Sequence, residues 1–408
     1  MRGSPTGEHR KSTGRRAICT ASGISEPTIS WTLDGIGHHA SWFSANDRPA
    51  PKKVVAVDDR LSADAAMRNA AQGIAMLWHG DYNNARQLLS AMDRRLGNIE
   101  AGRSLKRGQS DEQKFYSIRQ ARAHRSRMLS LLLVPLSVNG TPESTQISLT
   151  RAPEVGAAIA FGYEQFRGSH AGQAAVSLQE LTGVLSAHQW FLNGVEVPAL
   201  GKKIYPSYGT FMPTRQEYVD LVAKAPIKNA QVAFDIGTGT GVLAALLVAR
   251  GVKKVIGTDI HQRAVDCANQ NFAQLGISSS AHAELTNMFP NGKAPLIICN
   301  PPWLPGSAPT SLDAAIYDPG SKMLLQFLRG LPEHLTEDGE AWLIISDLAE
   351  LLGLRTSQAL ATAINDAGLK VTGQIDAQPQ HARAFDQSDL LYSARSVETT
   401  TLWRLAVQ

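Results

Sequence analysis

After Pro226, short apolar runs alternate with helical stretches, and this alternation constrains the fold more than any other feature of the sequence. Seven runs can be read as strands: AQVAFDIG, KKVIGTD, SAHAEL, APLIICN, EAWLIIS, LKVTGQID and TTTLWRLAV. Helical sequences such as GVLAALLVAR and HQRAVDCANQNFAQLG separate the first six. Strands that alternate with helices predict a mostly parallel sheet with helices on both faces. Because no helix separates the last two runs, we expect the final strand to be antiparallel.

The first half of the chain shows a different pattern. Residues 1–55 begin with the basic stretch MRGSPTGEHRKSTGRRA, which we interpret as part of a disordered extension, with a transit peptide as the alternative. Apolar residues at helical spacing predict a mainly helical domain over residues 56–200, which we expect to recognise the substrate. Its first two helices would meet in a hairpin at Gly80 and Asp81.

A third helix is expected from Ser110, where SDEQ has the form of a capping box, to Val134 before a proline. Two more fit the stretches PEVGAAIAFGYEQF and VSLQELTGVLSAHQWFL. Residues 201–408 would then form a second domain.

Composition excludes several classes of protein. A chain of 408 residues with 43% hydrophobic and 19% charged residues suits two globular domains, and a net charge of +4 permits a nucleic-acid partner without requiring one. Cys19, Cys267 and Cys299 are too far apart for a metal motif, and the histidines lack a second ligand at metal spacing, so we predict no metal site. The apolar stretch MLSLLLVPLSV is shorter than the roughly 18–20 residues that a membrane span needs. We therefore predict a cytoplasmic protein without a membrane segment.

Three glycines follow the first run, in the stretch VAFDIGTGTGVLAALL. Gly237, Gly239 and Gly241 lie between a strand and a helix, where a glycine-rich backbone can approach a ligand closely. The third glycine comes one residue too early for a dinucleotide fingerprint, and Asp235 favours a cation over a pyrophosphate. Asp259 ends the next run, where a carboxylate can accept both hydroxyls of a ribose. The alternative is a tight turn that binds no ligand.

The stretch CNPPWLP ends the fourth run and is expected beside the same loops. The side-chain carbonyl of Asn300 and the backbone carbonyl of Pro301 can both accept hydrogen bonds from a planar NH2 group. Pro301 and Pro302 stiffen the backbone, and Trp303 can stack on the planar group. These residues predict transfer of a group to an amide or an exocyclic amine, unless the stretch is only a proline-rich turn.

The glycine loop and the two acids, DIGTGTG followed by TDI, resemble class I S-adenosylmethionine-dependent methyltransferases. The resemblance implies an α/β fold with a seven-stranded, Rossmann-like methyltransferase sheet in residues 201–408, with S-adenosylmethionine as cofactor. It also implies a set of cofactor-binding residues: Asp235, Gly237, Thr238, Gly239, Gly241, Asp259, Ile260, Asn287 and Asn300. Asn287 stands where related enzymes often have an acid near the adenine amine.

The tetrad NPPW resembles the Asn-Pro-Pro-aromatic motif of N-methyltransferases that act on glutamine amides or on base amines, and it implies four catalytic residues: Asn300, Pro301, Pro302 and Trp303. The segment that ends in TFMPTRQEY resembles the lid of protein-glutamine methyltransferases for release factors or a ribosomal protein, and its lid residues would be Phe211, Pro213 and Arg215. The stretch IYDPGSKMLLQFL resembles the segment after the tetrad in that group. The chain departs from the group by having Pro-Thr-Arg for Pro-Arg-Pro and a tryptophan for the usual tyrosine.

We therefore predict methyl transfer to a glutamine side-chain amide in a protein of the translation machinery. A basic helix with Arg119, Arg122 and Arg125 favours the alternative, an adenine or guanine amine of ribosomal or transfer RNA, because arginines can contact phosphates. The same arginines can instead form a solvated face that pairs with acids elsewhere in the fold. A second alternative is a non-catalytic module that binds the cofactor and recognises RNA or a ribosomal protein.

Overall fold

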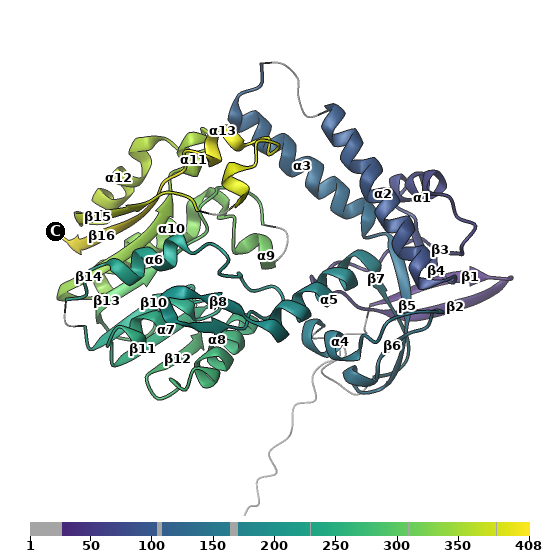
Figure 1. Ribbon diagram of the computed structural model, residues 1–408, viewed down its shortest axis with the longest axis horizontal. Coiled ribbons are helices and arrows are strands. Elements are labelled where there is room, and N and C mark those ends of the chain that lie inside the picture. Colours follow the sequence, from purple (N-terminus) through teal and green to yellow (C-terminus); the bar gives the residue numbers. More distant parts are fainter. Residues whose placement is uncertain (1–26, 104–107, 164–169, 229, 309–310, 381) are drawn as a thin grey trace, which may run out of the picture.

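The structure, a computed structural model, describes residues 27–103, 108–163, 170–228, 230–308, 311–380 and 382–408. These residues form two α/β units, and each unit is built on a seven-stranded sheet (Figure 1). A short antiparallel hairpin of β8 (Val195–Val197) and β9 (Lys202–Ile204), with the turn η3 (Pro198–Leu200), lies between the units in the chain.

The sheet of the second unit contains the seven strands that the sequence predicts. They are β10 (Val232–Ile236), β11 (Lys254–Asp259), β12 (Ala281–Leu285), β13 (Ala294–Cys299), β14 (Leu335–Ser346), β15 (Leu369–Ala377) and β16 (Thr400–Val407). Their order across the sheet is β12-β11-β10-β13-β14-β16-β15. The first five are parallel, and β16 pairs with β14 and β15 in antiparallel fashion. The Rossmann-like sheet and the antiparallel final strand are thus confirmed.

Helices cover both faces of this sheet. They are α6 (Glu217–Lys224), α7 (Val242–Ala249), α8 (Gln262–Gln274), α10 (Lys322–His334) and α12 (Ser357–Asp366), with the short elements α9 (Ser311–Ala314), η4 (Pro319–Ser321), α11 (Leu348–Leu351), η5 (Ala382–Phe385) and α13 (Tyr392–Arg395). Trp342 and Ile344 of β14 pack in one apolar cluster with α6, α7 and α8. Leu343 and Ile345 pack in a second cluster with α10 and α12. A strand whose neighbouring side chains are buried on opposite faces reads as a continuous apolar run, as these strands do.

The first unit contains a second sheet, with the strands β1 (Thr28–Leu33), β2 (Ile36–Trp42), β3 (Val54–Val57), β4 (Ala75–Trp78), β5 (Leu132–Gly140), β6 (Gln146–Ile147) and β7 (His170–Ser177). The order is β1-β2-β7-β5-β4-β3, and β6 pairs with β5. The helices of this unit are α1 (Ala63–Ala71), α2 (Tyr82–Arg103), α3 (Asp111–Leu129), α4 (Gly156–Gly162) and α5 (Leu178–Asn193), with the turn η1 (Pro142–Ser144).

The prediction of a disordered extension over residues 1–55 is wrong from residue 28 onward, and residues 1–26 lie outside the described chain. β1 and β2 form an antiparallel hairpin that turns at Asp34 and Gly35. Both turn residues have positive φ, 51° and 80°, as a type I′ hairpin turn requires. The hairpin buries Ile29 and Trp42, so it belongs to the folded core.

The prediction of a mainly helical domain over residues 56–200 missed the sheet on which the helices pack. Ala75–Trp78 and Leu132–Val134 are strand residues in stretches predicted to be helical. All of these side chains are buried, and a short, fully apolar run has no period that separates a buried strand from a buried helix. The capping box at Ser110 and Gln113 is confirmed at the start of α3.

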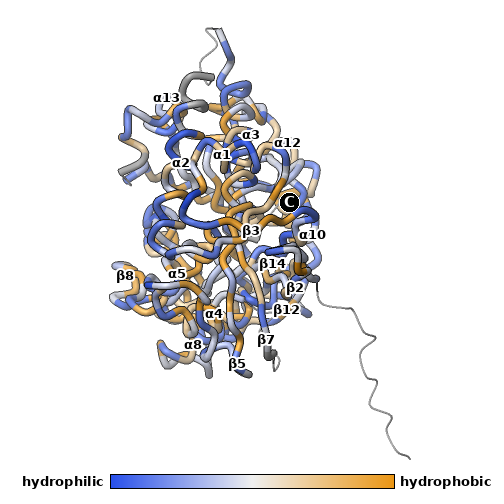
Figure 2. Tube along the Cα trace, turned by 90° about the vertical axis from the view of Figure 1, so that its right-hand side faces the viewer, coloured by the Kyte–Doolittle hydropathy of each residue, from blue (hydrophilic) through white to orange (hydrophobic). Residues whose placement is uncertain are grey.

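Helix α3 extends from the first unit to the second, where its N-terminal part lies beside α11 and α13 (Figure 1). Hydrophobic residues concentrate in the interior of the molecule, and hydrophilic residues are common at its periphery (Figure 2). None of the helices that the structure describes combines the length and the apolar character that crossing a bilayer requires.

Candidate active site

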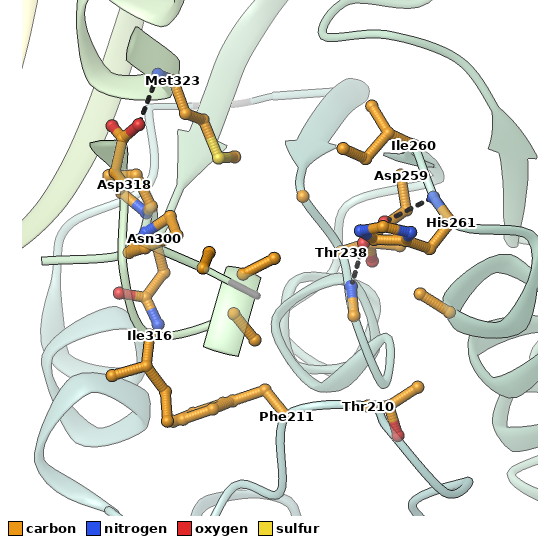
Figure 3. Close-up of a pocket in the computed structure, with 18 of the residues that line it drawn as sticks. Thr210, Phe211, Thr238, Asp259, Ile260, His261, Asn300, Ile316, Asp318 and Met323 are labelled. Carbon is orange, nitrogen blue, oxygen red and sulfur yellow. Dashed lines mark hydrogen bonds between the residues drawn. The ribbon is translucent and has the colours of Figure 1, made fainter. Parts of the chain in front are cut away.

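A pocket of about 800 Å³ opens at the carboxyl ends of β10, β11 and β13. Parallel sheets bind ligands at this edge. Most of the predicted site residues line it, namely Phe211, Arg215, Asp235, Gly237, Thr238, Gly239, Asp259, Ile260, Asn287, Asn300, Pro301, Pro302 and Trp303. Asp259, Ile260 and His261 lie on one side and Asn300, Ile316 and Asp318 on the other (Figure 3). The first unit contributes Ala45, Asp47 and Arg122, so the pocket lies between the two units.

The glycine loop has the backbone shape that the sequence predicts. Gly237, Gly239 and Gly241 have φ of 70°, 54° and 78°, in the region that favours glycine. A Cβ atom on Gly237 would lie 2.8 Å from Met323 Cε in the pocket wall. Gly241 is not among the lining residues, and its Cβ would lie 2.6 Å from the Phe272 ring. Gly241 therefore permits the close packing of α7 against α8.

Asp235 is a buried acid at the end of β10, only 1% exposed. Its Oδ2 accepts hydrogen bonds from Thr238 Oγ1 at 2.7 Å and from the Ala244 backbone N–H at 3.1 Å. Burial raises its pKa to about 6, in spite of these two bonds. A cationic ligand in the pocket would offset the cost of this desolvated charge.

Asp259 ends the neighbouring strand β11. Its Oδ2 accepts from the Gly239 backbone N–H at 3.2 Å, and its Oδ1 accepts from the His261 backbone N–H at 3.0 Å. Burial raises the pKa of Asp259 as well. The carboxylate thus joins the glycine loop to the loop after β11. The backbone N–H of Thr286 donates to the Asp259 carbonyl at 3.0 Å, which brings Asn287 to the same wall.

The Asn-Pro-Pro-Trp tetrad follows β13 directly. Trp303 Nε1 donates a hydrogen bond to Asn300 Oδ1 at 2.9 Å, which fixes the orientation of the carboxamide. An amide oxygen has two lone pairs, so this bond leaves one acceptor site for a ligand. Past the tetrad, Leu304 forms a parallel bridge with Tyr317. Asp318 accepts from the backbone N–H groups of Met323 and Leu324 and so caps α10.

The lid segment is attached to the C-terminal part of the sheet. The Arg215 guanidinium donates to both carboxylate oxygens of Glu398, at 3.1 and 3.0 Å. Glu398 is 1% exposed and also accepts from Ser346 Oγ at 2.7 Å. The same guanidinium lies 5.2 Å from the centroid of the Trp303 ring. Pro213 is buried outside the pocket lining, and its carbonyl accepts from Gln216.

The three arginines of α3 have different surroundings. Arg119 lies over the Tyr317 ring and donates to the Ser307 carbonyl. Arg125 forms an ion pair with Asp93 at 2.6 Å. Arg122 is exposed, lines the pocket and forms no ion pair with any residue that the structure describes. Two of the three therefore serve contacts within the protein.

Some residues of this site were not found by sequence analysis. Glu398 is 183 residues from Arg215, and Asp47 lies in a segment that we interpreted as disordered, so no local pattern marks either residue. Tyr317 and Asp318, in contrast, belong to the stretch IYDPGSKMLLQFL, whose sequence already suggests a role beside the tetrad. Among the described residues, no group of three or more His, Cys, Asp and Glu side chains could hold a metal ion.

A family model described as the methyltransferase small domain matches residues 219–365. A protein of Methanocaldococcus jannaschii named as a protein N5-glutamine methyltransferase is 30% identical over 162 residues, which cover 38% of this chain and 80% of that protein. The chain belongs to the methyltransferase small domain family. It is an S-adenosylmethionine-dependent methyltransferase, as its tetrad and glycine loop predict.

Other relatives of this methyltransferase carry names for two kinds of substrate. A release factor glutamine methyltransferase of Cereibacter sphaeroides is 28% identical over 209 residues, 48% of this chain and 70% of that protein. A tRNA1(Val) (adenine(37)-N6)-methyltransferase of Shewanella sediminis is 32% identical over 108 residues, 24% of this chain and 44% of that protein. The chain thus spans less than half of the length of the tRNA enzyme.

The pocket fits S-adenosylmethionine. The cofactor carries a cationic sulfonium and an ammonium group, and Asp235 is a buried carboxylate whose raised pKa a cation would lower. Gly237 and Gly239 have positive φ and no side chain, so the backbone at these positions can lie close to the ligand. The volume of about 800 Å³ is within the usual range for pockets of ligand size and leaves room beside the cofactor.

Proposed function

We propose that this methyltransferase transfers a methyl group to the side-chain amide of a glutamine in a cytoplasmic protein of the translation machinery. The observation that carries the proposal is the orientation of the Asn300 carboxamide, which Trp303 holds at the pocket wall opposite Asp259 (Figure 3). An oriented amide oxygen beside a cofactor pocket is suited to present a planar NH2 group to a methyl donor.

The acids and the glycine loop would hold the cofactor. When bound, S-adenosylmethionine supplies an electrophilic methyl group. Asp235 would attract its cationic end and Asp259 its ribose hydroxyls, with Thr238, Ile260 and Asn287 around them. Phe211 and Arg215 of the lid segment line the same pocket and would limit the access of water.

Asn300 and Pro301 would present the nitrogen. An amide nitrogen is a weak nucleophile, because its lone pair is delocalised into the carbonyl group. Hydrogen bonds from its two N–H groups to the Asn300 side-chain oxygen and the Pro301 carbonyl would favour the positive charge that develops as the nitrogen attacks. Trp303 and Pro302 would pack against the planar group. No side chain of the protein would form a covalent intermediate in this scheme. As the new nitrogen–carbon bond forms, the bond between sulfur and the methyl group would break, the demethylated cofactor would leave as a neutral thioether, and the nitrogen would release one proton to solvent.

Two observations support a glutamine amide over a base amine. Arg119 and Arg125, two of the three arginines that favour RNA, are engaged in contacts within the protein. This chain covers 80% and 70% of the length of the two relatives named as glutamine methyltransferases. It covers 44% of the length of the tRNA methyltransferase. Of these three arginines, Arg122 still favours the RNA alternative.

The test is transfer of a labelled methyl group from S-adenosylmethionine into a lysate of cells that lack the protein, followed by separate nuclease and protease treatment. We expect label in a protein band that survives nuclease, and mass spectrometry of that band should locate it on a glutamine. Asn300→Ala should lower turnover by ~10² or more while the affinity for S-adenosylmethionine stays nearly the same. The matched control is Asn365→Ala, which removes an exposed asparagine at the end of α12.

Label that disappears with nuclease would overturn the choice of substrate in favour of RNA. No label in either fraction, with intact cofactor binding in the wild type and in Asn300→Ala, would identify a non-catalytic module. An equal loss of cofactor binding in Asn300→Ala would assign Asn300 to the shape of the pocket alone.

A further inference from the structure

The N-terminal part of α3 is built into the second unit. Phe115 is 2% exposed and packs in one apolar cluster with Leu304, Leu348, Leu352 and Leu391. The first of these partners is the residue that directly follows the tetrad. A helix of the first unit is therefore anchored beside the loop that carries the catalytic residues.

Arg119, one turn along α3 from Phe115, contacts both arms of the loop after the tetrad. Its guanidinium carbon lies 3.4 Å from the centroid of the Tyr317 ring, on the second arm, residues 313–318. Its Nη2 donates to the Ser307 carbonyl on the first arm, residues 304–308. A planar guanidinium can stack on a ring and donate in its own plane at the same time, so one side chain holds both arms.

The base of this loop is continuous with the active site. Leu304 and Tyr317 form a parallel bridge, and the Asp318 backbone N–H donates to the Leu304 carbonyl at 2.9 Å. Residues of both arms, including Ala308 and Tyr317, line the pocket beside the tetrad. A shift of either arm would therefore move the backbone that positions Asn300 and Trp303.

We propose that Arg119 is a positioning residue, supplied by the first unit, that holds the tetrad in its catalytic geometry. The first unit then takes part in catalysis through α3, in addition to any role in recognising the substrate. This role leaves Arg119 unavailable for the phosphate contacts that the RNA alternative would require. The inference rests on the proposed methyl transfer for its activity readout, whereas its structural readout needs no substrate.

The experiment compares full-length wild type with Arg119→Ala and with Arg119→Met, which keeps the aliphatic length but loses the guanidinium. The matched control is Arg127→Ala, an exposed arginine of the same helix whose contact to His124 stays within α3. Hydrogen–deuterium exchange is followed in peptides that cover residues 300–308 and 313–318. Calorimetry measures S-adenosylmethionine affinity, and the lysate assay measures labelled methyl transfer.

We expect both Arg119 variants to exchange faster in these two peptides than wild type, with exchange elsewhere in α3 unchanged. Turnover should fall about tenfold to 10²-fold with little change in cofactor affinity, because a misplacement of about 1 Å at the reacting centre can cost 10²-fold. Arg127→Ala should match wild type in all three measurements.

Unchanged exchange in residues 300–308 and 313–318 would overturn the inference, as would faster exchange along the whole of α3, which would show a general structural role. Wild-type turnover in both Arg119 variants would also overturn it. If the wild type transfers no label, the proposed function fails, and the exchange result still decides whether Arg119 holds the loop.

Discussion

We expect Asp235→Asn to stabilise the ligand-free protein while it weakens the binding of S-adenosylmethionine. Asp235 is 1% exposed, and burial raises its pKa from 3.8 to about 6. An acid with a raised pKa in the folded state destabilises that state at neutral pH, because the unfolded chain ionises the acid more easily. Both hydrogen bonds described for the carboxylate fall on Oδ2, so the amide oxygen of an asparagine can retain them.

The size of the effect depends on pH. At pH 8 the acid is ionised in both states, and a difference of about two pKa units corresponds to about 3 kcal/mol of unfolding free energy. Between about pH 6 and 3.8 the folded state takes up its proton first, so the destabilisation falls to roughly half at pH 5 and vanishes at lower pH. For a unit of about 200 residues, Asp235→Asn should raise the Tm by about 6–12 °C at pH 8 and by roughly half of that at pH 5.

Differential scanning calorimetry at pH 5 and pH 8, with and without S-adenosylmethionine, measures these changes. The cofactor should raise the Tm of the wild type more than that of Asp235→Asn, because stabilisation by a ligand follows its affinity. The control is Asp366→Asn, an exposed acid at the end of α12, which should shift the Tm little at either pH. A Tm of Asp235→Asn below wild type at pH 8, or the same Tm increase at both pH values, would refute the reasoning.

Three further predictions concern other parts of the second unit. Glu398→Gln should destabilise it by about 2 kcal/mol, because Glu398 is buried and the partly buried Arg215 guanidinium would lose its charged partner; an unchanged Tm would contradict this. Gly241→Ala should lower both the Tm and the cofactor affinity, because the new Cβ would meet the Phe272 ring at 2.6 Å in a backbone conformation that alanine rarely adopts, and calorimetry measures both. Cys299 should resist alkylation by iodoacetamide at pH 8 until the protein unfolds, since burial raises its thiol pKa well above the usual value, and peptide mass mapping reports the modified cysteines.

The sheet of the second unit could be predicted because helical stretches separate most of its strands, and glycines or acids mark the ends of several apolar runs. The sheet of the first unit was harder to predict from the same patterns. Leu132–Val134 follow a helical stretch without a clear break, whereas Gly73, with a φ of 71°, separates α1 from Ala75–Trp78 and was a signal that the helical spacing of the apolar residues outweighed. For the hairpin of residues 28–42 a signal did exist, the Asp34-Gly35 turn between two runs with buried aromatic residues. The basic, glycine-rich residues before it dominated the composition of the whole segment.

The site shows a similar division. Residues that follow a strand directly, such as Asp235, Asp259 and Asn300, were found because the carboxyl ends of parallel strands meet at one edge. Contacts between distant segments were not found, since Glu398 and Arg119 reach their partners across 183 and 188 residues. Spacing along the chain carries no information on such pairs.

The anchoring of α3 on the loop after the tetrad limits how this protein can be recombined with its relatives. A chimera that joins the first unit of one protein to the second unit of another would bring together a helix and a loop that did not evolve as partners. Phe115 and Arg119 would then meet a foreign surface in place of Leu304, Ser307 and Tyr317. We expect a chimera to be active only when α3 and residues 300–318 come from the same parent protein. The exchanged part must therefore include segments of both units.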